Sequence, residues 1–309
     1  MIRLGTRRSP LALAQAGEIA ERLRRLGDEV AIVPMRTEGD RLFDVQLARL
    51  GGKGLFVRDI EQALLDGAVD IAVHSLKDLP ADVPRGLTLA AFPEREDPRD
   101  VLVTRDGGEL DDLRAGAVIG TSSPRRRALV LSARPDLVVE PIRGNVETRL
   151  QKLQTGACDA IVLAMAGLRR LNLRPPHVSP LAPDTFVPAV GQGVLAIEAR
   201  RDDDAVLRRV APLDHGETRL CALAERAFLR RLGASCVSPM AAHATLEAAS
   251  LELRAMVASD DGRQIVRGVA SGAPDDAEAI GRGLAESLLE RGAAAVTTLN
   301  PLRRGDAGG

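Results

Sequence analysis

The sequence is poor in aromatic residues: its 309 residues include five Phe, no Tyr and no Trp. Its 42 basic and 43 acidic residues leave a formal net charge of −1. Proteins that bind nucleic acid usually need a net basic field and, for single strands, aromatic side chains on which bases stack. The composition therefore disfavours a nucleic-acid-binding regulator, and any basic site must be local.

Cysteine is also scarce. Cys158, Cys221 and Cys236 lie far apart, and no CxxC, HExxH or clustered Cys/His spacing is present, so neither a disulfide framework nor a metal site is predicted. No hydrophobic run approaches the length of a membrane span, and the N-terminal MIRLGTRRSP lacks the apolar core of a signal peptide. We expect a soluble cytoplasmic protein with reduced thiols.

The first third of the chain alternates short apolar strands with amphipathic helices. Strands are expected at residues 2–6, 29–35 and 70–74. A helix opens at Ser9-Pro10, with the serine as cap and the proline at the first helical position, and a second helix is expected at 55–65. This alternation predicts a mostly parallel sheet with helices on both faces.

The second third repeats that plan. VIGTSSP at 118–124 is similar to IRLGTRRSP at 2–10, and GACDAIVL at 156–163 is similar to GAVDIAVH at 67–74. Two matched landmarks in the same order predict two similar α/β lobes, residues 1–95 and 99–188. A strand at 194–199 is expected to return the chain to the first lobe, so that 194–213 belongs there. Lobes joined by crossing segments should face each other across a cleft.

The last third changes character and predicts a small α+β domain at 216–302. A helix is expected at 217–232, strands at 243–248, 251–258 and 264–270, and a capped helix at 275–291. DDG at 260–262 is typical of a hairpin turn between the last two strands. Residues 303–309 are expected to form a loose tail.

Basic and polar residues follow the carboxyl ends of the predicted strands in both lobes. Ligands of open α/β sheets bind at these ends, and arginine forks hold carboxylates and phosphates bidentately. Any single arginine is more often a solvated surface group, but the joint pattern predicts a cleft for a ligand with several anionic groups. Lys77 and Asp78 alone fit a turn and a site equally well. The residues at these ends are Arg7, Ser9, Lys77, Asp78, Thr121, Ser122, Ser123, Arg125, Arg126, Arg143, Arg149, Arg169 and Arg170.

Two glycine-rich stretches do not fit nucleotide motifs. GGKG at 51–54 has no preceding strand and no following Ser or Thr, and GQGVLA at 191–196 precedes a strand instead of following one. Both are interpreted as loops or hinges. Cys158, Cys221 and the four histidines, His74 among them, are expected to be isolated packing residues. Cys236 differs, because it lies in a loop between a helix and a sheet, where a thiol is accessible.

Seven motifs stand in order along the chain: TRRSPLAL (6–13), GGKGLF (51–56), HSLKD (74–78), EREDPRD (94–100), GTSS (120–123) with Arg125 and Arg126, RGN (143–145) and PAVGQG (188–193). Taken together and in this order, they resemble those of the porphobilinogen deaminase (hydroxymethylbilane synthase) family. The likeness runs nearly from end to end, and in that family two lobes like those of a type 2 periplasmic binding protein are followed by a third domain.

The resemblance implies a transferase that joins four porphobilinogen units head to tail, releasing ammonia from each, to give hydroxymethylbilane in tetrapyrrole biosynthesis. A dipyrromethane cofactor, held by a thioether to a cysteine of the third domain, primes the chain; that cysteine is Cys236 by motif position. Asp78 aligns with the catalytic carboxylate. Expected cofactor contacts are Lys77, Ser123, Arg125, Arg126 and Arg143; expected substrate contacts are Arg7, Ser9, Arg149 and Arg170; Lys53 and Phe56 belong to an expected lid.

Two local departures from the family pattern are Pro124, which we expect only to fix a helix start, and the approach Gly233-Ala-Ser to Cys236. Two other functions remain as alternatives: a non-catalytic two-lobed protein that binds a small anion, and a nucleic-acid-binding regulator. The partner we expect is the small-molecule substrate, bound by a monomer without nucleic acid or membrane.

Overall fold

The computed structural model describes residues 1–35, 57–233, 238–297 and 299. The chain divides into two compact units, Met1–Glu96 with Gly193–Arg219 and Asp97–Gln192 with Leu220–Gly309. In the described residues, no helix combines the length and the apolar composition needed to cross a lipid bilayer.

The first unit is built on a five-stranded sheet of order β2-β1-β3-β10-β4. β1 pairs in parallel with β2 and β3, whereas β10 lies antiparallel between β3 and β4, so one strand opposes the other four. The elements are β1 (Ile2–Arg7), α1 (Pro10–Arg25), β2 (Val30–Met35), α3 (Arg58–Leu65), β3 (Ile71–Ser75), the 3₁₀ turn η4 (Leu76–Asp78), β4 (Leu87–Ala91), β10 (Leu195–Arg200), α7 (Asp204–Val210) and η5 (Ala211–Leu213).

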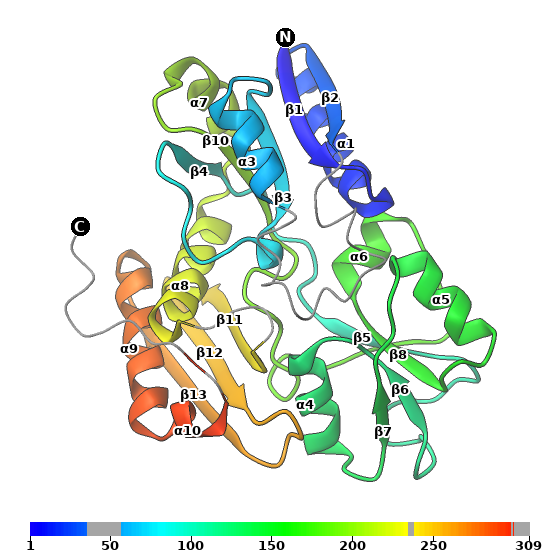
Figure 1. Cartoon of the computed structure of the whole chain (residues 1–309). Coiled ribbons are helices and arrows are strands. Elements are labelled where there is room, and N and C mark those ends of the chain that lie inside the picture. Colours follow the sequence, from blue (N-terminus) through cyan, green and yellow to red (C-terminus); the bar gives the residue numbers. More distant parts are fainter. Residues whose placement is uncertain (36–56, 234–237, 298, 300–309) are drawn as a thin grey trace. The chain divides into compact units, whose positions relative to one another are not determined.

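Both faces of this sheet are covered, because successive strand residues point to opposite sides. Ile71 and Val73 of β3 pack with Ile19 and Leu23 of α1. Ala72, between them, packs with Ile60 and Leu64 of α3. Figure 1 shows α1 beside β1 and β2.

The second unit contains a five-stranded sheet of order β7-β6-β8-β5-β9, with β5 as the antiparallel insertion between β8 and β9. Its elements are β5 (Asp100–Thr104), β6 (Val118–Gly120), α4 (Pro124–Ala133), β7 (Val138–Glu140), α5 (Val146–Gln154), β8 (Ala160–Ala164), α6 (Met165–Arg170) and β9 (Val178–Pro180). Strand order and directions match those of the first sheet position by position, which confirms the predicted internal repeat.

The C-terminal part of the second unit forms the predicted α+β structure. Three antiparallel strands, in the order β11-β12-β13, pack against α8 and α9. The sheet also shares a core with the second five-stranded sheet, because Ala241 and Met256 pack with Leu102 and Leu129. The elements are α8 (Gly216–Leu232), which begins in the first unit, β11 (Met240–Glu247), β12 (Ser250–Ala258), β13 (Ile265–Gly272), η6 (Pro274–Asp276), α9 (Ala277–Glu290) and α10 (Ala293–Val296).

The tip of the β12–β13 hairpin sits directly on α4. Gly262 has φ +69°, and a Cβ atom built on it would lie 2.2 Å from the carbonyl oxygen of Ala128. Only glycine suits both the left-handed backbone and this close approach. The hairpin predicted at 260–262 is thus confirmed, and its tip is fixed to the helix that begins with Pro124.

The prediction of two similar α/β lobes with a small C-terminal α+β part is confirmed, as is the return of 194–199 to the first sheet. The strand expected at 243–248 begins earlier, at Met240. β4, β5, β9, α6 and α7 were not predicted. The three-domain boundaries and the cleft stay predictions.

Candidate active site

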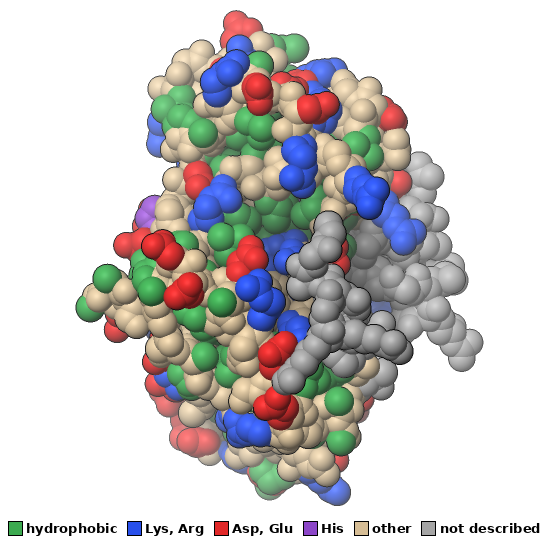
Figure 2. Space-filling view, turned by 90° about the vertical axis from the view of Figure 1, so that its left-hand side faces the viewer, with side chains coloured by type: hydrophobic (Ala, Val, Ile, Leu, Met, Phe, Trp, Pro, Cys, Tyr) green, Lys and Arg blue, Asp and Glu red, His purple; other side chains and the backbone are tan. Residues whose placement is uncertain are grey.

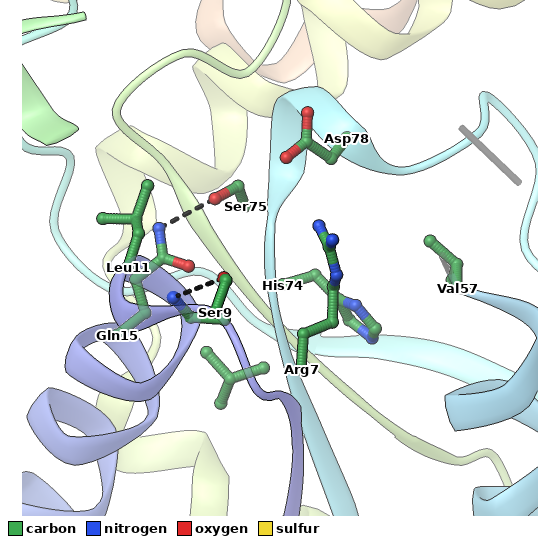
Figure 3. A pocket seen from close by; sticks show the side chains of 10 residues that line it. Arg7, Ser9, Leu11, Gln15, Val57, His74, Ser75 and Asp78 are labelled. Carbon is green, nitrogen blue, oxygen red and sulfur yellow. Dashed lines mark hydrogen bonds between the residues drawn. The ribbon is translucent and has the colours of Figure 1, made fainter. Parts of the chain in front are cut away.

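A pocket of about 200 Å³ opens in the first unit at the ends of β1 and β3 (Figure 3). Three residues expected at the site line it: Arg7, Ser9 and Asp78. The other lining residues are Leu11, Ala12, Gln15, Val57, Val73, His74 and Ser75. The structure therefore brings together residues separated by about seventy positions in the sequence.

The start of α1 places Arg7 and Ser9 at this pocket. Arg7 is the last residue of β1, and Ser9 is the N-cap of α1, its Oγ accepting a hydrogen bond of 3.3 Å from the backbone N–H of Ala12. Pro10 is the first helical residue, as predicted. The N-terminus of this 16-residue helix presents the positive end of its dipole to the pocket, which favours an anionic ligand.

The turn after β3 explains why a lysine and an aspartate stand side by side. β3 ends at Ser75, and Leu76, Lys77 and Asp78 form one 3₁₀ turn. Leu76 is 1% exposed and its N–H donates to the carbonyl of Val194, so the turn is anchored from inside. Asp78 lines the pocket, and Figure 3 shows Arg7 extending from β1 toward the turn that carries it.

Gln15 ties the helix to the strand beneath the pocket. Its Nε2 donates a hydrogen bond of 2.8 Å to the Oγ of Ser75, drawn in Figure 3, and its side chain is 5% exposed. A buried amide with a partner of this kind fixes the distance between α1 and β3. Gln15 was not predicted as a site residue; its position one helical turn and a half after the Ser9 cap is the signal that sequence reasoning missed.

The prediction that His74 is isolated is wrong. Its Nε2 lies 3.1 Å from Oε2 of Glu198, with the two side chains 6% and 0% exposed. Glu61 of α3 is buried nearby, where burial, and next the charge of Glu198, raise the pKa of Glu61 to about 7. His243 and His215 are not isolated either: His243 Nδ1 lies 3.5 Å from Glu225 Oε1, and His215 Nδ1 lies 3.0 Å from Thr218 Oγ1. Cys158 and Cys221 are buried in cores, as predicted.

In the second unit, Arg125 and Arg126 share one buried carboxylate that the sequence analysis did not assign. Nη1 of Arg125 donates to Oδ2 of Asp100 at 2.6 Å, and Nη2 and Nε of Arg126 donate to Oδ1 at 2.7 and 3.1 Å. Burial alone would raise the pKa of Asp100, but the two guanidinium groups outweigh it and hold that pKa far below its usual range. Gln192 donates to the same carboxylate at 2.9 Å.

The start of α4 repeats the start of α1. Ser123 is the N-cap, its Oγ accepting from the N–H of Arg126, and Pro124 is the first helical residue, so the expectation that Pro124 fixes the helix start is confirmed. Arg149 donates from Nε to the carbonyl of Gly144, and burial, followed by the charge of Arg126, lowers its pKa. Arg126 and Arg149 therefore act on each other electrostatically.

The remaining predicted residues lie elsewhere. Arg143 is exposed in the loop before α5, and Arg170 ends α6 and is half-buried. Lys77 is half-buried on the turn before Leu79. Lys53, Phe56 and Cys236 lie outside the described residues, and the roles expected for all predicted site residues stay predictions.

Comparisons with known proteins give two matching models of one family. Residues 2–208 match the family model described as porphobilinogen deaminase, dipyromethane cofactor binding domain, and residues 219–290 match the C-terminal domain of the same family. A porphobilinogen deaminase from Syntrophotalea carbinolica is 49% identical over 294 residues, 94% of this chain and 93% of the relative. The chain belongs to the porphobilinogen deaminase family.

Some solved structures are similar at low identity. A periplasmic substrate-binding protein of an ABC transporter from Coxiella burnetii is 18% identical, with a TM-score of 0.41 over 73% of this chain and 97% of that one. A nutrient-binding protein from Burkholderia cenocepacia, bound to methionine, is 16% identical, with a TM-score of 0.41 over 68% and 90%.

Within the porphobilinogen deaminase family match, every predicted site residue except Cys236 falls in the cofactor-binding domain, and Cys236 falls in the C-terminal domain. The side chains present suit the cofactor. A dipyrromethane carries carboxylates, and Arg125 and Arg126 bring two positive charges against the single negative charge of Asp100. One net positive charge thus remains in this cluster for an anionic group.

Proposed function

We propose that this chain joins four porphobilinogen units head to tail, with release of four ammonia molecules, to give hydroxymethylbilane. The observation that carries the proposal is the pocket of Arg7, Ser9 and Asp78, which pairs cationic and hydrogen-bonding groups with one carboxylate inside the family's cofactor-binding domain. The covalently attached dipyrromethane supplies the pyrrole to which the first substrate unit is added.

Charge explains the number of arginines. Each porphobilinogen unit brings an acetate and a propionate, so every addition places two more carboxylates on the protein. Arg7, which lines the pocket, and the N-terminus of α1 at Ser9 are suited to bind them. Arg149 and Arg170 extend the same substrate-binding role into the second unit.

Asp78 stabilises the charge that develops in the reaction. When ammonia leaves the aminomethyl group, the electron pair of the C–N bond leaves with it, and the pyrrole nitrogen acquires positive charge. A fixed carboxylate near the pyrrole N–H favours that state over the neutral ground state. Its fixed position follows from the buried Leu76, which anchors the turn on which Asp78 sits.

The cofactor is held by side chains that bind its carboxylates and by one covalent bond. Lys77, Ser123, Arg125, Arg126 and Arg143 bind its carboxylates, and the thiolate of Cys236 forms the thioether that tethers it. Cys236 is a permanent anchor and does not turn over. Lys53 and Phe56, which lie outside the described residues, stay the expected lid residues.

The proposal extends to a cytoplasmic monomer that binds no nucleic acid. The formal net charge of −1 supports the last part, and in Figure 2 basic and acidic side chains are intermingled on the visible face. Size-exclusion chromatography with light scattering tests the monomer; a mass of twice 32.8 kDa would contradict it.

Intact mass of the purified chain tests the function and the tether together. The wild type should carry an adduct of two pyrrole units, and Cys236→Ser should carry none and should release no ammonia from porphobilinogen. Cys158→Ser, at a buried packing position, is the matched control and should keep the adduct. An unmodified wild type that still makes hydroxymethylbilane would disprove the tether, and a wild type that binds a small anion without turnover would favour the non-catalytic alternative.

A further inference from the structure

Three ionisable side chains lie together between α3 and the first sheet, beside the pocket. His74 of β3, Glu198 of β10 and Glu61 of α3 are 7%, 0% and 8% exposed. The same layer also contains apolar residues, among them Ile60 and Leu64. His74 is the member of the trio that also lines the pocket, as Figure 3 shows.

The register between β3 and β10 places His74 and Glu198 beside each other. β3 and β10 are antiparallel, with His74 opposite Ala196 and Ala72 opposite Glu198. His74 and Glu198 are therefore diagonal neighbours on the same face, a spacing that long side chains bridge. Nε2 of His74 and Oε2 of Glu198 lie 3.1 Å apart, and α3 closes the layer above them.

This arrangement is costly for folding. A fully buried carboxylate needs partners, yet Oε1 of Glu198 has no hydrogen-bond partner among the described residues. Apolar side chains of similar volume would pack in this layer with equal or better stability. Buried ionisable side chains that lower the stability of the fold and lie beside a pocket are candidates for function.

We propose that His74 accepts the proton that the pyrrole ring releases when two units are joined, with Glu198 as its positioning residue. The inference rests on the proposed function and adds a base to it. A carboxylate at Nε2 favours the tautomer with its hydrogen on Nε2, so the lone pair is on Nδ1, and the same carboxylate stabilises the imidazolium that forms.

The coupling step begins at the aminomethyl group of the incoming unit. The C–N bond of the incoming unit breaks and ammonia takes its electron pair. A new bond joins the methylene carbon to the free α-carbon of the accepting pyrrole. The C–H bond at that α-carbon then breaks, its electrons restore the aromatic ring, and the proton passes to Nδ1 of His74, from where the ammonia or water removes it.

The ionisation of Glu61 determines how much negative charge lies near His74. Its pKa near 7 means that the carboxyl changes from neutral to anionic around neutral pH, next to Glu198 and under the opposing influence of His74 and Arg58. Among the described residues, Arg7 and Asp78 are the other charged groups that line the pocket. An anionic Glu61 adds to Glu198 in favouring the imidazolium.

The experiment uses His74→Gln in the cofactor-loaded enzyme, with porphobilinogen deuterated at the free α-carbon. Glutamine keeps a donor toward Glu198 but accepts no proton at neutral pH. Loss of a general base lowers kcat by about 10²–10⁴-fold. We expect a fall in this range with KM changed less than threefold, a deuterium effect on kcat well above that of the wild type, and loss of the decline in rate toward low pH.

Glu198→Gln tests the positioning role. It should lower kcat less than His74→Gln and shift the acid side of the pH–rate profile instead of removing it. His243→Gln is the matched control, because His243 is an equally buried histidine near a glutamate in the second unit. It should leave both the pH profile and the isotope effect unchanged.

Intact mass separates the two proposals. A wild type without the pyrrole adduct overturns the proposed function. A loaded His74→Gln variant with kcat within threefold of the wild type and no added isotope effect overturns this inference alone. If His74→Gln fails to load or fold, ¹⁵N-histidine NMR of the wild type decides, with the four histidines assigned by single substitutions of His177, His215 and His243. We expect the hydrogen of the neutral His74 ring on Nε2, toward Glu198, and none on Nδ1; a neutral ring with its hydrogen on Nδ1 overturns the proposal.

Discussion

Arg125 and Asp100 are joined by a hydrogen bond of 2.6 Å between Nη1 and Oδ2, with the two side chains 5% and 0% exposed. Asp100 begins β5, the strand inserted antiparallel into the second sheet, and Arg125 lies in the first turn of α4. The ion pair therefore holds the start of α4, which carries both Arg125 and Arg126, against β5 of the second sheet.

Asp100→Asn should leave two buried guanidinium groups with no compensating anion at this position. Removing one partner of a buried ion pair costs about 3–5 kcal/mol of unfolding free energy. Because the pKa of Asp100 is lowered in the folded state, its stabilisation is present above the ordinary carboxyl value of 3.8 and is lost as pH falls below it. Denaturant unfolding from pH 7 to pH 3 should show the gap between wild type and variant narrowing; a constant gap would contradict the assignment.

Asp78→Asn should retain the pyrrole adduct but lose about 10²–10³-fold in kcat, because the amide carries no negative charge to stabilise the developing cation. Ammonia release and intact mass measure the two effects separately. Asp82→Asn, an exposed carboxylate four residues later, is the control and should behave as the wild type. Near-normal rates in Asp78→Asn would show that the carboxylate is not catalytic.

Glu61→Gln should stabilise the protein at alkaline pH and not at acid pH. The folded state raises the pKa of Glu61 from 4.5 to about 7, so it binds more protons than the unfolded state between these values. Stability of the wild type consequently falls as pH rises from 4.5 to 7, and a neutral glutamine avoids this loss. After allowance for partial solvation we expect a gain of about 1–2 kcal/mol at pH 8. Thermal melting of both proteins at pH 4.5 and pH 8 measures this gain in stability. An equal effect of the substitution at both pH values would contradict the raised pKa of Glu61.

Gly262→Ala should destabilise the chain by about 1–3 kcal/mol, because the new Cβ meets the Ala128 carbonyl and alanine resists a positive φ. Gly283→Ala is the control. Gly283 lies inside α9 with no atom within 4 Å of a built Cβ, so alanine there should stabilise by about 0.5–1 kcal/mol. Chemical denaturation should show a lower free energy of unfolding for Gly262→Ala and a higher one for Gly283→Ala. An unchanged free energy for Gly262→Ala would mean that the contact between the hairpin tip and α4 does not require glycine.

The sequence predicted those parts of the fold that local patterns encode. Ser9-Pro10 was predicted as a helix start because cap and proline are adjacent in the chain, and Pro124 was expected to fix a second start; both are helix starts in the structure. β4 and β9 were missed, since short edge strands carry little periodicity, and β5 was missed although it is fully buried.

The site was predicted unevenly for a related reason. Residues within a motif, such as Lys77 and Asp78, are visible by inspection. The pairings of Asp100 with Arg125 and of His74 with Glu198 span 25 and 124 positions, and no local pattern specifies them. Such partners follow from strand register, which only the assembled sheet supplies.

The insertion of β10 between β3 and β4 also bears on how the protein is made. A ribosome adds roughly 5–20 residues per second, so β3 and β4 emerge well before Leu195 is synthesised. Until then the nascent first lobe has two unsatisfied strand edges, which are templates for wrong pairing. Shortened chains ending before residue 195 should therefore aggregate, and a chaperone that shields strand edges should matter most during that interval.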